Sequence, residues 1–459
     1  MTDTLSAAKL AAEASRGPRY TSYPPATEFA PLDGEAVLRE LDLVAALGEA
    51  TSLYVHIPFC RSLCWYCGCN VVPTRDTNAG AKYVEHLADE ASLVGSWLGH
   101  APVTEIALGG GSPNFLSPAS LRKLFAALSS RFEIAPDARR SIELDPRTTT
   151  SEQLETLAAA RFRSLSVGVQ DFSEAVQDAI HRHQSTAQTR WLIESARSLG
   201  FDDVNVDVVY GLPCQTEASF ARTIEAVIDL APERIALFGY AHLPDKLPHQ
   251  RLVERAGRVL VGEERAALFL RAMDQLTSAG YVHVGLDHFA KPSSRLARAA
   301  DAHQITRSFQ GYTERRADTV IGLGMSAISS TPRMHWQNHS ELGAWQQAVT
   351  SATLPVARGV VLDNDDQVRR EVIGRLMCDG EVDLYRIGAE HGLNAPSYFA
   401  SELDRLARLA DLARYDRDTQ TVHTTTLGRL LVRNVCQVFD RYQRPTASAD
   451  AEPRFSPTI

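Results

Sequence analysis

The chain has 459 residues, of which 44% are hydrophobic, so it can bury a large core and form one large domain with one or two smaller ones. Its 47 basic and 56 acidic residues give a formal charge of −9, which excludes a general attraction to nucleic acid or to an anionic membrane surface. Neither a signal-peptide pattern nor an apolar run of the ~20 residues that span a bilayer is evident, so we expect a cytoplasmic protein without a membrane segment.

Residues 1–50 form an N-terminal arm. They begin as an alanine-rich helical segment and continue as an extended stretch punctuated by proline, Arg16-Gly17-Pro18-Arg19-Tyr20-Thr21-Ser22-Tyr23-Pro24-Pro25. Two interpretations stay open. The arm is either a strap across the surface, as most loops are, or a lid that carries arginine and tyrosine side chains.

From residue 52 the sequence alternates short apolar runs with amphipathic segments of helix length, which is the pattern of βα units. The predicted strands span 52–58, 103–109, 141–145, 164–169, 203–209 and 234–240, and the predicted helices 80–98, 117–131, 151–161, 185–199 and 216–230. Six such units predict an α/β fold with a partial (β/α)6 TIM-like barrel. Its chemistry should lie at the C-terminal ends of the strands.

The alternation breaks after residue 240. A helix is predicted over 262–279, a strand or extended run over 281–289 and a glycine-punctuated loop over 318–329. We therefore assign residues 51–362 to a catalytic barrel with an extension. Residues 363–459 contain short charged helices and a hairpin, which predict a mostly helical, winged-helix-like domain. Because the acidic balance does not suit DNA binding, this domain should pack against the barrel.

Four of the seven cysteines lie within ten residues, as Cys60, Cys64, Cys67 and Cys69. The other cysteines are isolated in the sequence, which does not resemble a disulfide framework. Three thiolates at the spacing of Cys60, Cys64 and Cys67 can bind three irons of a [4Fe–4S] cluster and leave the fourth iron open. Zinc is the alternative, but it usually requires a second pair of ligands. Cys69 is too close to Cys67 to join them, and is either a small structural residue or a free thiol near the reaction centre.

Polar residues also mark the ends of later strands. A glycine-rich segment, 109–113, follows the second strand, and Glu143, Gln170 and Asp207 lie in or after the next three. Buried carboxylates need a cation or a donor, so each could form an internal ion pair. Taken together, one at each strand end, these groups predict a ligand shell.

The segment His181-Arg182-His183 could suggest a metal site. On a helix, residues two apart face different directions, so we expect these side chains to face solvent or to make one ligand contact.

The cysteine spacing is similar to that of radical S-adenosylmethionine enzymes. More narrowly, the chain resembles oxygen-independent coproporphyrinogen III oxidases over essentially its whole length. The resemblance rests on segments 17–24, 54–60, 67–70, 168–172, 210–213, 240–244, 287–290, 309–313 and 455–459.

This resemblance implies a [4Fe–4S] cluster held by Cys60, Cys64 and Cys67, and two molecules of S-adenosylmethionine. The first molecule would chelate the open iron and contact Tyr54, Gly110, Glu143 and Ile328. The second would contact Tyr66, Gly111, Ser112, Gln170, Arg182, Asp207 and Ala241. The family commonly has threonine where Ser112 stands, so the hydroxyl is retained. Cys69 and Tyr54 are the candidate catalytic residues.

The resemblance also implies the reaction. A one-electron reductant, such as a flavodoxin-like or ferredoxin-like protein, would start radical cleavage of S-adenosylmethionine, and two propionates of coproporphyrinogen III would become vinyl groups. The four carboxylates of that substrate require cations, and Arg19 and Arg16 of the arm are the candidates. We expect a monomer, and an arm that covers the barrel mouth.

A related haem-binding chaperone without decarboxylase activity is the alternative. Such chaperones resemble this family and keep the three-cysteine loop. They look to lack the arginine- and tyrosine-bearing arm and usually have no cysteine at the position of Cys69, whereas this chain has both.

Overall fold

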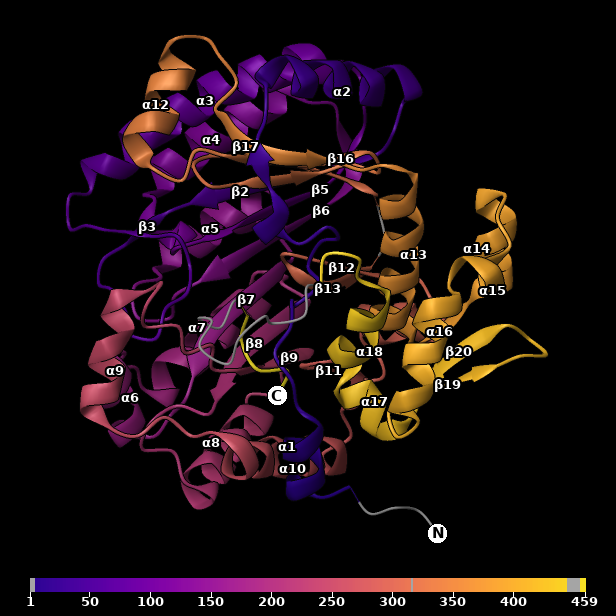
Figure 1. Ribbon diagram of the computed structural model, residues 1–459. Helices are drawn as coiled ribbons and strands as arrows, with labels where there is room; N and C mark the ends of the chain where they lie inside the picture. The colour runs from indigo at the N-terminus through magenta and orange to yellow at the C-terminus, as the bar shows by residue number, and fades with distance from the viewer. Residues whose placement is uncertain (1–4, 315–316, 444–454) are drawn as a thin grey trace.

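The centre of the molecule is a 13-stranded sheet whose seven middle strands are parallel (Figure 1). The computed structural model describes residues 5–314, 317–443 and 455–459. The strand order is β1-β17-β16-β15-β14-β2-β5-β6-β7-β8-β9-β11-β10. The protein thus has a mixed α/β fold with a parallel central sheet, as the alternating pattern predicted.

Six of the parallel strands are those that the sequence predicted. They are β2 (Thr51–Ile57), β5 (Val103–Gly110), β6 (Ile134–Leu144), β7 (Ser164–Gln170), β8 (Asp203–Tyr210) and β9 (Arg234–Gly239). The helices between them are α3 (Asn78–Leu98), α4 (Pro118–Arg131), α5 (Ser151–Ala159), α6 (Glu174–Ile180), α7 (Thr186–Ser198) and α8 (Glu217–Asp229). The short helix α6 was not predicted.

Local sequence explains where several of these helices begin. Ser117, Thr150, Ser185 and Thr216 precede α4, α5, α7 and α8, and each side chain accepts a hydrogen bond from a backbone N–H in the first turn. Such a cap satisfies an otherwise unpaired donor and stabilises a helix by about 1 kcal/mol. The capping residues therefore fix the turns that follow each strand.

The prediction of a loop over 318–329 was wrong. Residues Thr319–Leu323 form β14, which pairs in parallel with β2 and adds a seventh strand to the parallel sheet. A Cβ at Gly322 would lie 2.8 Å from the carbonyl oxygen of Ile328, so glycine is needed for the tight return into the next strand. The glycines that suggested a loop are thus part of a short buried strand and its turn.

Antiparallel strands extend the sheet at both edges. Beyond β14 lie β15 (Ile328–Ser330), β16 (Met334–Asn338), β17 (Val356–Val361) and β1 (Ala30–Pro31), and beyond β9 lie β11 (His288–Ala290) and β10 (Val282–Gly285). Two short pairs stand apart, β3 (Phe59–Cys60) with β4 (Val72–Pro73) and β12 (Ile305–Ser308) with β13 (Gly311–Glu314). Further helices are α1 (Ala7–Glu13), α2 (Gly34–Leu47), α9 (Arg251–Ala256), α10 (Gly262–Ser278), α11 (Arg295–Asp301) and α12 (Leu342–Thr350).

The C-terminal part contains the predicted short helices and hairpin, and lies beside the sheet at the right of Figure 1. Its helices are α13 (Asn364–Asp379), α14 (Leu384–His391), α15 (Ala395–Tyr398), α16 (Ala400–Leu406), α17 (Thr426–Leu430) and α18 (Val432–Phe439). Strands β18 (Glu381–Asp383), β20 (Thr421–Thr424) and β19 (Ala413–Asp416) form a small antiparallel sheet. Buried apolar side chains from this part and from the central sheet belong to one continuous core.

The N-terminal arm runs between the central sheet and the C-terminal helices. Arg433 of α18 donates hydrogen bonds to the carbonyl oxygens of Gly17 and Pro18, and also to those of Ser456 and Pro457. Tyr20 donates from its hydroxyl to Asp440 at 3.0 Å. One buried arginine therefore binds the arm and residues 455–459 together.

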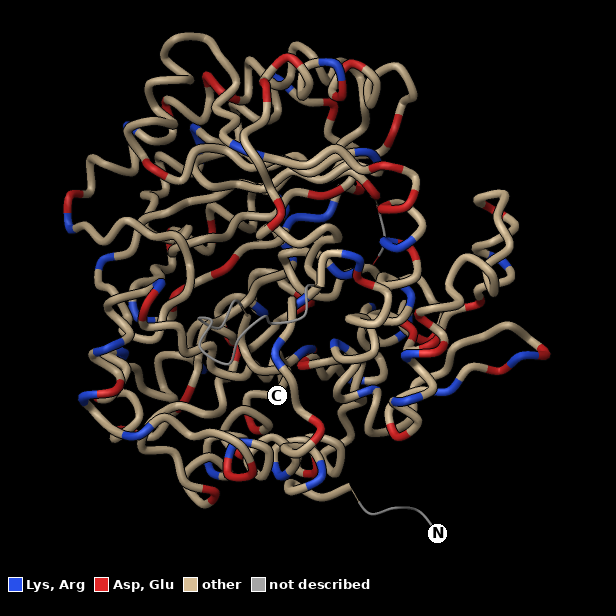
Figure 2. Tube along the Cα trace, viewed as in Figure 1, with Lys and Arg blue, Asp and Glu red and all other residues tan. Residues whose placement is uncertain are grey.

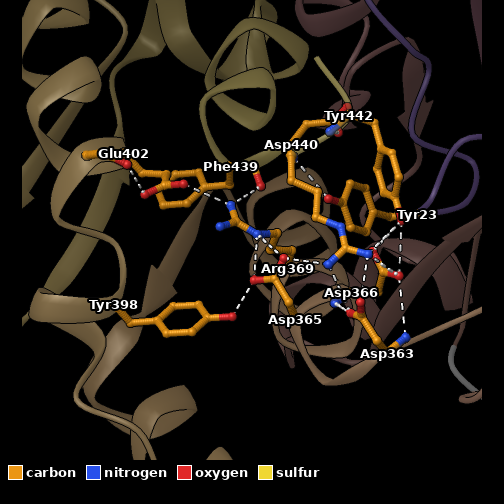
Figure 3. Close-up of polar contacts among 12 residues, drawn as sticks. Tyr23, Asp363, Asp365, Asp366, Arg369, Tyr398, Glu402, Phe439, Asp440 and Tyr442 are labelled. Carbon is orange, nitrogen blue, oxygen red and sulfur yellow. Dashed lines mark hydrogen bonds and ion pairs between the residues drawn. The ribbon is translucent and has the colours of Figure 1, made fainter. Parts of the chain in front are cut away.

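A second set of polar contacts holds the arm at Tyr23 (Figure 3). The Tyr23 hydroxyl accepts from the backbone N–H of Arg441, and the Arg441 guanidinium donates to Asp363, Asp365 and Asp366 at the start of α13. Asp366 is fully buried and also accepts from the Tyr442 hydroxyl at 2.9 Å. These contacts join the arm, the start of α13 and the end of α18.

Basic and acidic residues are interspersed along the chain (Figure 2). Within the described ranges, no helix is both long and apolar enough to cross a bilayer.

Candidate active site

A cavity of about 890 Å³ lies against the central sheet. Its wall includes five of the residues that the sequence singled out, namely Tyr54, Cys69, Gly110, Glu143 and Ile328. Residues 20–23 of the arm line it as well, together with side chains from β12 and α13. The volume is at the upper end of the range for small-molecule sites, so the cavity has room for a large ligand.

The cysteine loop, residues 60–70, begins at the last residue of β3. Contacts from distant segments fix its position. The backbone N–H of Trp65 donates to the carbonyl oxygen of Ile180, and Gln250 donates from its side chain to the carbonyl oxygen of Tyr66 at 3.0 Å. The side chain of His249 is hydrogen-bonded to the carbonyl oxygen of Cys67. The loop is therefore held in place by its surroundings.

The three thiols fit the predicted [4Fe–4S] cluster. Cys60, Cys64 and Cys67 are free thiols on one loop. In a cubane cluster each thiolate binds a different iron, so three such thiols match a [4Fe–4S] cluster with one open iron. The thiol of Cys64 also accepts from the guanidinium groups of Arg147 and Arg182, each at 3.6 Å. Such positive donors match the negative charge of a thiolate-bound cluster.

Asp145 holds these two guanidinium groups in place. Its carboxylate lies 2.6 Å from Arg147 and 3.5 Å from Arg182. Burial opposes ionisation of Asp145, but the neighbouring charges of Arg182 and Arg147 outweigh it and lower the carboxyl pKa to about 2. The carboxylate therefore stays charged at neutral pH and orients both donors toward Cys64.

His181 and His183 are exposed, as we expected, although they do not lie on a helix, whereas Arg182 is buried, which we did not expect. Helix α6 ends at Ile180, and His181 has a φ of 54°. This left-handed residue turns the chain so that Arg182 is buried and donates to the carbonyl oxygen of Gly168 at 2.6 Å. His181 stays outside and stacks on Trp65 of the cysteine loop.

Glu143 lies at the end of β6 and lacks an ion-pair partner within the described part of the chain. Its carboxylate accepts from the backbone N–H of Gly110 at 3.2 Å. Burial and the nearby charge of Asp207 raise the Glu143 pKa to about 7. A Cβ at Gly109 would lie 2.8 Å from this carboxylate, so a larger residue there would displace the Glu143 side chain. The arrangement leaves a carboxylate acceptor in the cavity wall.

Asp207 is the second unpaired carboxylate of the strand ends. It accepts from the side chains of Asn205 at 2.7 Å and Ser166 at 3.1 Å, and burial raises its pKa. The donors to Asp207 are uncharged, as is the backbone N–H that donates to Glu143. Both carboxylates therefore retain the capacity to bind a cation or a hydroxyl group of a ligand.

The remaining predicted site residues do not line the 890 Å³ cavity. Gly111 and Ser112 donate from their backbone N–H groups to Ile57 and Phe59, and the Ser112 hydroxyl lies 3.6 Å from the Cys60 sulfur. Gln170 ends β7 with a φ of 68°, and the carbonyl oxygen of Ala241 accepts from Gln250. Thus Tyr54, Gly110, Glu143 and Ile328 share the cavity, whereas Tyr66, Gly111, Ser112, Gln170, Arg182, Asp207 and Ala241 do not.

Three further residues, which the sequence did not single out, shape the site. His56 lines the cavity and bonds through its ring nitrogens to the Tyr54 hydroxyl and the Asn70 carbonyl oxygen; burial lowers its pKa to about 4. Gln250 connects the cysteine loop to Ala241. Glu90 is a carboxylate on the buried face of α3. Its place in the sequence, between the apolar residues Leu87 and Ala91 of that face, was the signal that could have identified it.

Glu90 positions the turn that leads to Ile328. Its carboxylate accepts from the backbone N–H of Gly324, the side-chain amide of Asn338 and the indole of Trp345, at 2.7, 2.6 and 3.1 Å. These donors come from three segments far away in the sequence, so one acceptor fixes their relative positions.

Replacing Glu90 with alanine should therefore lower the free energy of unfolding by about 3 to 5 kcal/mol, because buried donors lose their acceptor. Urea unfolding would measure the loss. Glu85→Ala on the same helix is the control, since Glu85 is exposed and pairs only with Lys123, and should change stability by less than about 0.5 kcal/mol. Equal stabilities of the two variants would contradict the role of Glu90.

Comparisons with known proteins identify the family. Residues 54–227 match the Radical SAM superfamily. The oxygen-independent coproporphyrinogen III oxidase of Pseudomonas aeruginosa is 40% identical to this chain over 433 residues, which cover 93% of each chain. That of Escherichia coli K12 is 39% identical to it over 432 residues, which cover 94% of each chain. The solved coproporphyrinogen III oxidase of Escherichia coli, described as a radical SAM enzyme, superimposes with a TM-score of 0.88 at 37% identity, covering 93% of this chain and 98% of that one. With this extent of similarity, the chain belongs to the oxygen-independent coproporphyrinogen III oxidase family of the radical SAM superfamily.

Proposed function

We propose that this protein converts two propionate side chains of coproporphyrinogen III to vinyl groups without oxygen, giving protoporphyrinogen IX in haem biosynthesis. The observation that supports this function most is the cavity that combines Cys69 of the cysteine loop, the unpaired carboxylate of Glu143 and the arm. The relatives with this enzyme name cover nearly the whole chain.

Membership in the radical SAM superfamily implies a [4Fe–4S] cluster and S-adenosylmethionine. Bound together, they supply a radical that removes a hydrogen atom from an unactivated carbon. Cys60, Cys64 and Cys67 would hold the cluster. We further propose two molecules of S-adenosylmethionine, the first at Tyr54, Gly110, Glu143 and Ile328, and the second at Tyr66, Gly111, Ser112, Gln170, Arg182, Asp207 and Ala241.

Each conversion removes one hydrogen atom from the β-carbon of a propionate, then one electron and CO₂, and leaves a carbon–carbon double bond. The protein must orient the propionate and exclude water while these steps occur. Tyr20, Tyr23 and the Tyr54–His56 pair line the cavity and serve these purposes in our proposal. Carboxylate acceptors such as Glu143 suit the ammonium group of the first S-adenosylmethionine.

The finer architecture follows from the same proposal. We infer a partial (β/α)6 barrel over residues 51–362, preceded by the arm of residues 1–50 and followed by a winged-helix-like domain over 363–459. We expect the enzyme to act as a cytoplasmic monomer that receives electrons one at a time from a flavodoxin-like or ferredoxin-like protein.

Anaerobic incubation of the reconstituted protein with coproporphyrinogen III, S-adenosylmethionine and dithionite tests the function. Formation of protoporphyrinogen IX, with two molecules of CO₂ released per substrate, is the expected result. Stable binding of haem without any decarboxylation would instead support the haem chaperone and refute the proposed activity.

Cys69 is a proposed catalytic residue, because its side chain is exposed in the cavity wall two residues after Cys67. In Cys69→Ser, the iron content should remain that of the wild type, while decarboxylation should fall by at least about 100-fold, the usual contribution of a group that transfers a proton or hydrogen to the reacting atoms. Iron analysis and product formation measure the two effects. Wild-type turnover in this variant would leave Cys69 with a structural role only.

A further inference from the structure

The cavity is lined by several arginines, and they differ in how completely they are paired. Arg370 donates to the carbonyl oxygen of Thr331 at 2.6 Å, Arg375 lies 3.5 Å from Asp379, and Arg386 lies 3.4 Å from Glu390. Each of these guanidinium groups therefore has a close oxygen partner, on the same helix for Arg375 and Arg386. Arg307 is different.

Arg307 comes from β12 and its side chain is only 4% exposed. Only the Nε atom of its guanidinium makes a hydrogen bond within the described residues, to the carbonyl oxygen of Arg19 at 3.1 Å. The Nη1 atom is buried and has no hydrogen-bond partner. The planar group lies 4.7 Å from the ring centre of Tyr312, which holds it in one orientation.

The nearest carboxylate does not satisfy Arg307. Asp287 lies 4.0 Å from Nη1, and its two oxygens are already engaged with His288 at 2.6 Å and with Arg19 at 3.6 Å. Arg433 is buried close by, and burial together with the charges of Arg19 and Arg307 lowers its pKa to about 9. This part of the molecule therefore holds more buried positive charge than the single Asp287 can neutralise, and it favours an added anion.

The arginines of the arm that the sequence suggested for the substrate do not line the cavity. Arg19 is paired with Asp287 and donates to the carbonyl oxygen of Gly239, and Arg16 donates to that of Phe455. The arm contributes in another way, because the Arg19 carbonyl oxygen orients Arg307 through its Nε atom.

We propose that Arg307 binds the carboxylate of one propionate of the tetrapyrrole substrate, and that this propionate is one of the two retained in the product. The assignment rests on the proposed function. A guanidinium group stabilises the ionised carboxylate through paired hydrogen bonds. Such stabilisation would oppose loss of CO₂ from a reacting propionate, since it favours the ground state, and it suits a group that only anchors the ring.

Binding of coproporphyrin III, the stable oxidised form with four carboxylates, tests this assignment without turnover. The probe is titrated into the full-length reconstituted protein and followed by its fluorescence, beside its uncharged tetramethyl ester. Arg307→Gln should weaken binding of the free acid by at least about thirtyfold and leave that of the ester unchanged, because only the acid carries the anion. Arg386→Gln is the matched control, another cavity arginine that already has acidic partners, and should bind both probes as the wild type does.

Equal affinities of wild type and Arg307→Gln for the free acid would overturn the assignment, and so would an equal loss for acid and ester. If Arg307→Gln does not fold, as judged by circular dichroism, Arg307→Lys replaces it. That variant keeps the charge but loses the paired donors, and should still weaken binding of the acid alone. The proposed function is judged separately, by product formation in the wild type, so it can stand if the assignment of Arg307 fails.

Discussion

Replacing Cys64 with serine should remove the absorbance of the iron–sulfur cluster and abolish decarboxylation. The loop provides three thiols for a cluster that needs three, so loss of one leaves two irons without a ligand instead of one. Serine matches cysteine in shape but offers a hard oxygen donor in place of a soft thiolate. Iron per chain, the visible spectrum after anaerobic reconstitution and product formation measure the result.

Cys214→Ser is the control for this experiment. Cys214 is also a free cysteine, but it is exposed and its thiol contacts only the carbonyl oxygen of Ala256, at 3.9 Å. Its variant should keep the iron and the activity of the wild type. Unchanged iron content in Cys64→Ser would refute the assignment of the cluster ligands.

Replacing Glu143 with glutamine should weaken binding of S-adenosylmethionine by at least about thirtyfold, the loss expected for a buried charge pair that loses its anion. The size of the side chain is kept, so the change tests the charge. Glu314→Gln is the control, because Glu314 also lines the cavity but is already paired with Arg139 at 2.6 Å. Anaerobic equilibrium dialysis with labelled S-adenosylmethionine measures the affinities.

The same carboxyl group predicts a dependence on pH. The pKa of Glu143 is raised to about 7, so the group is largely protonated at pH 6 and ionised at pH 8. An ammonium group binds the ionised form, and affinity should therefore fall by up to tenfold for each unit below pH 7 and level off above it. In Glu143→Gln this dependence should disappear. An affinity of the wild type that is constant from pH 6 to 8 would contradict the proposed contact.

Much of the fold could be predicted because strands and helices carried local signals. The capping residues Ser117, Thr150, Ser185 and Thr216 stand directly before apolar periodic segments, and the strand boundaries agree with prediction to within two residues for all but β6. Strand β14 carried the opposite signal, since Gly322 and Gly324 interrupt a short apolar run. Those glycines are needed because other backbone atoms approach closely, at Ile328 and His56, and that closeness exists only in the folded chain.

The site could be predicted where it depended on strand ends. Of the strand-end groups predicted to form a ligand shell, Gly110 and Glu143 line the cavity, whereas Gln170 and Asp207 do not. Arg307 gave no such signal and Glu90 only that of a carboxylate on the apolar face of a helix, because the importance of each depends on groups far away in the sequence. Arg307 bonds to Arg19 across 288 residues, and Glu90 to Trp345 across 255. A lone arginine in a hairpin and a lone glutamate in a helix look ordinary until those partners are known.

The four carbonyl oxygens that Arg433 binds have a consequence for how the protein is made. Two of them belong to residues 17 and 18, and the arginine itself is synthesised more than 400 residues later. At typical synthesis rates of 5 to 20 residues per second, the arm waits roughly 20 to 80 seconds before α18 exists. Until then the wall formed by residues 20–23 lacks its final support. The central sheet can thus form during synthesis, while the closed cavity is completed only after α18 has been made.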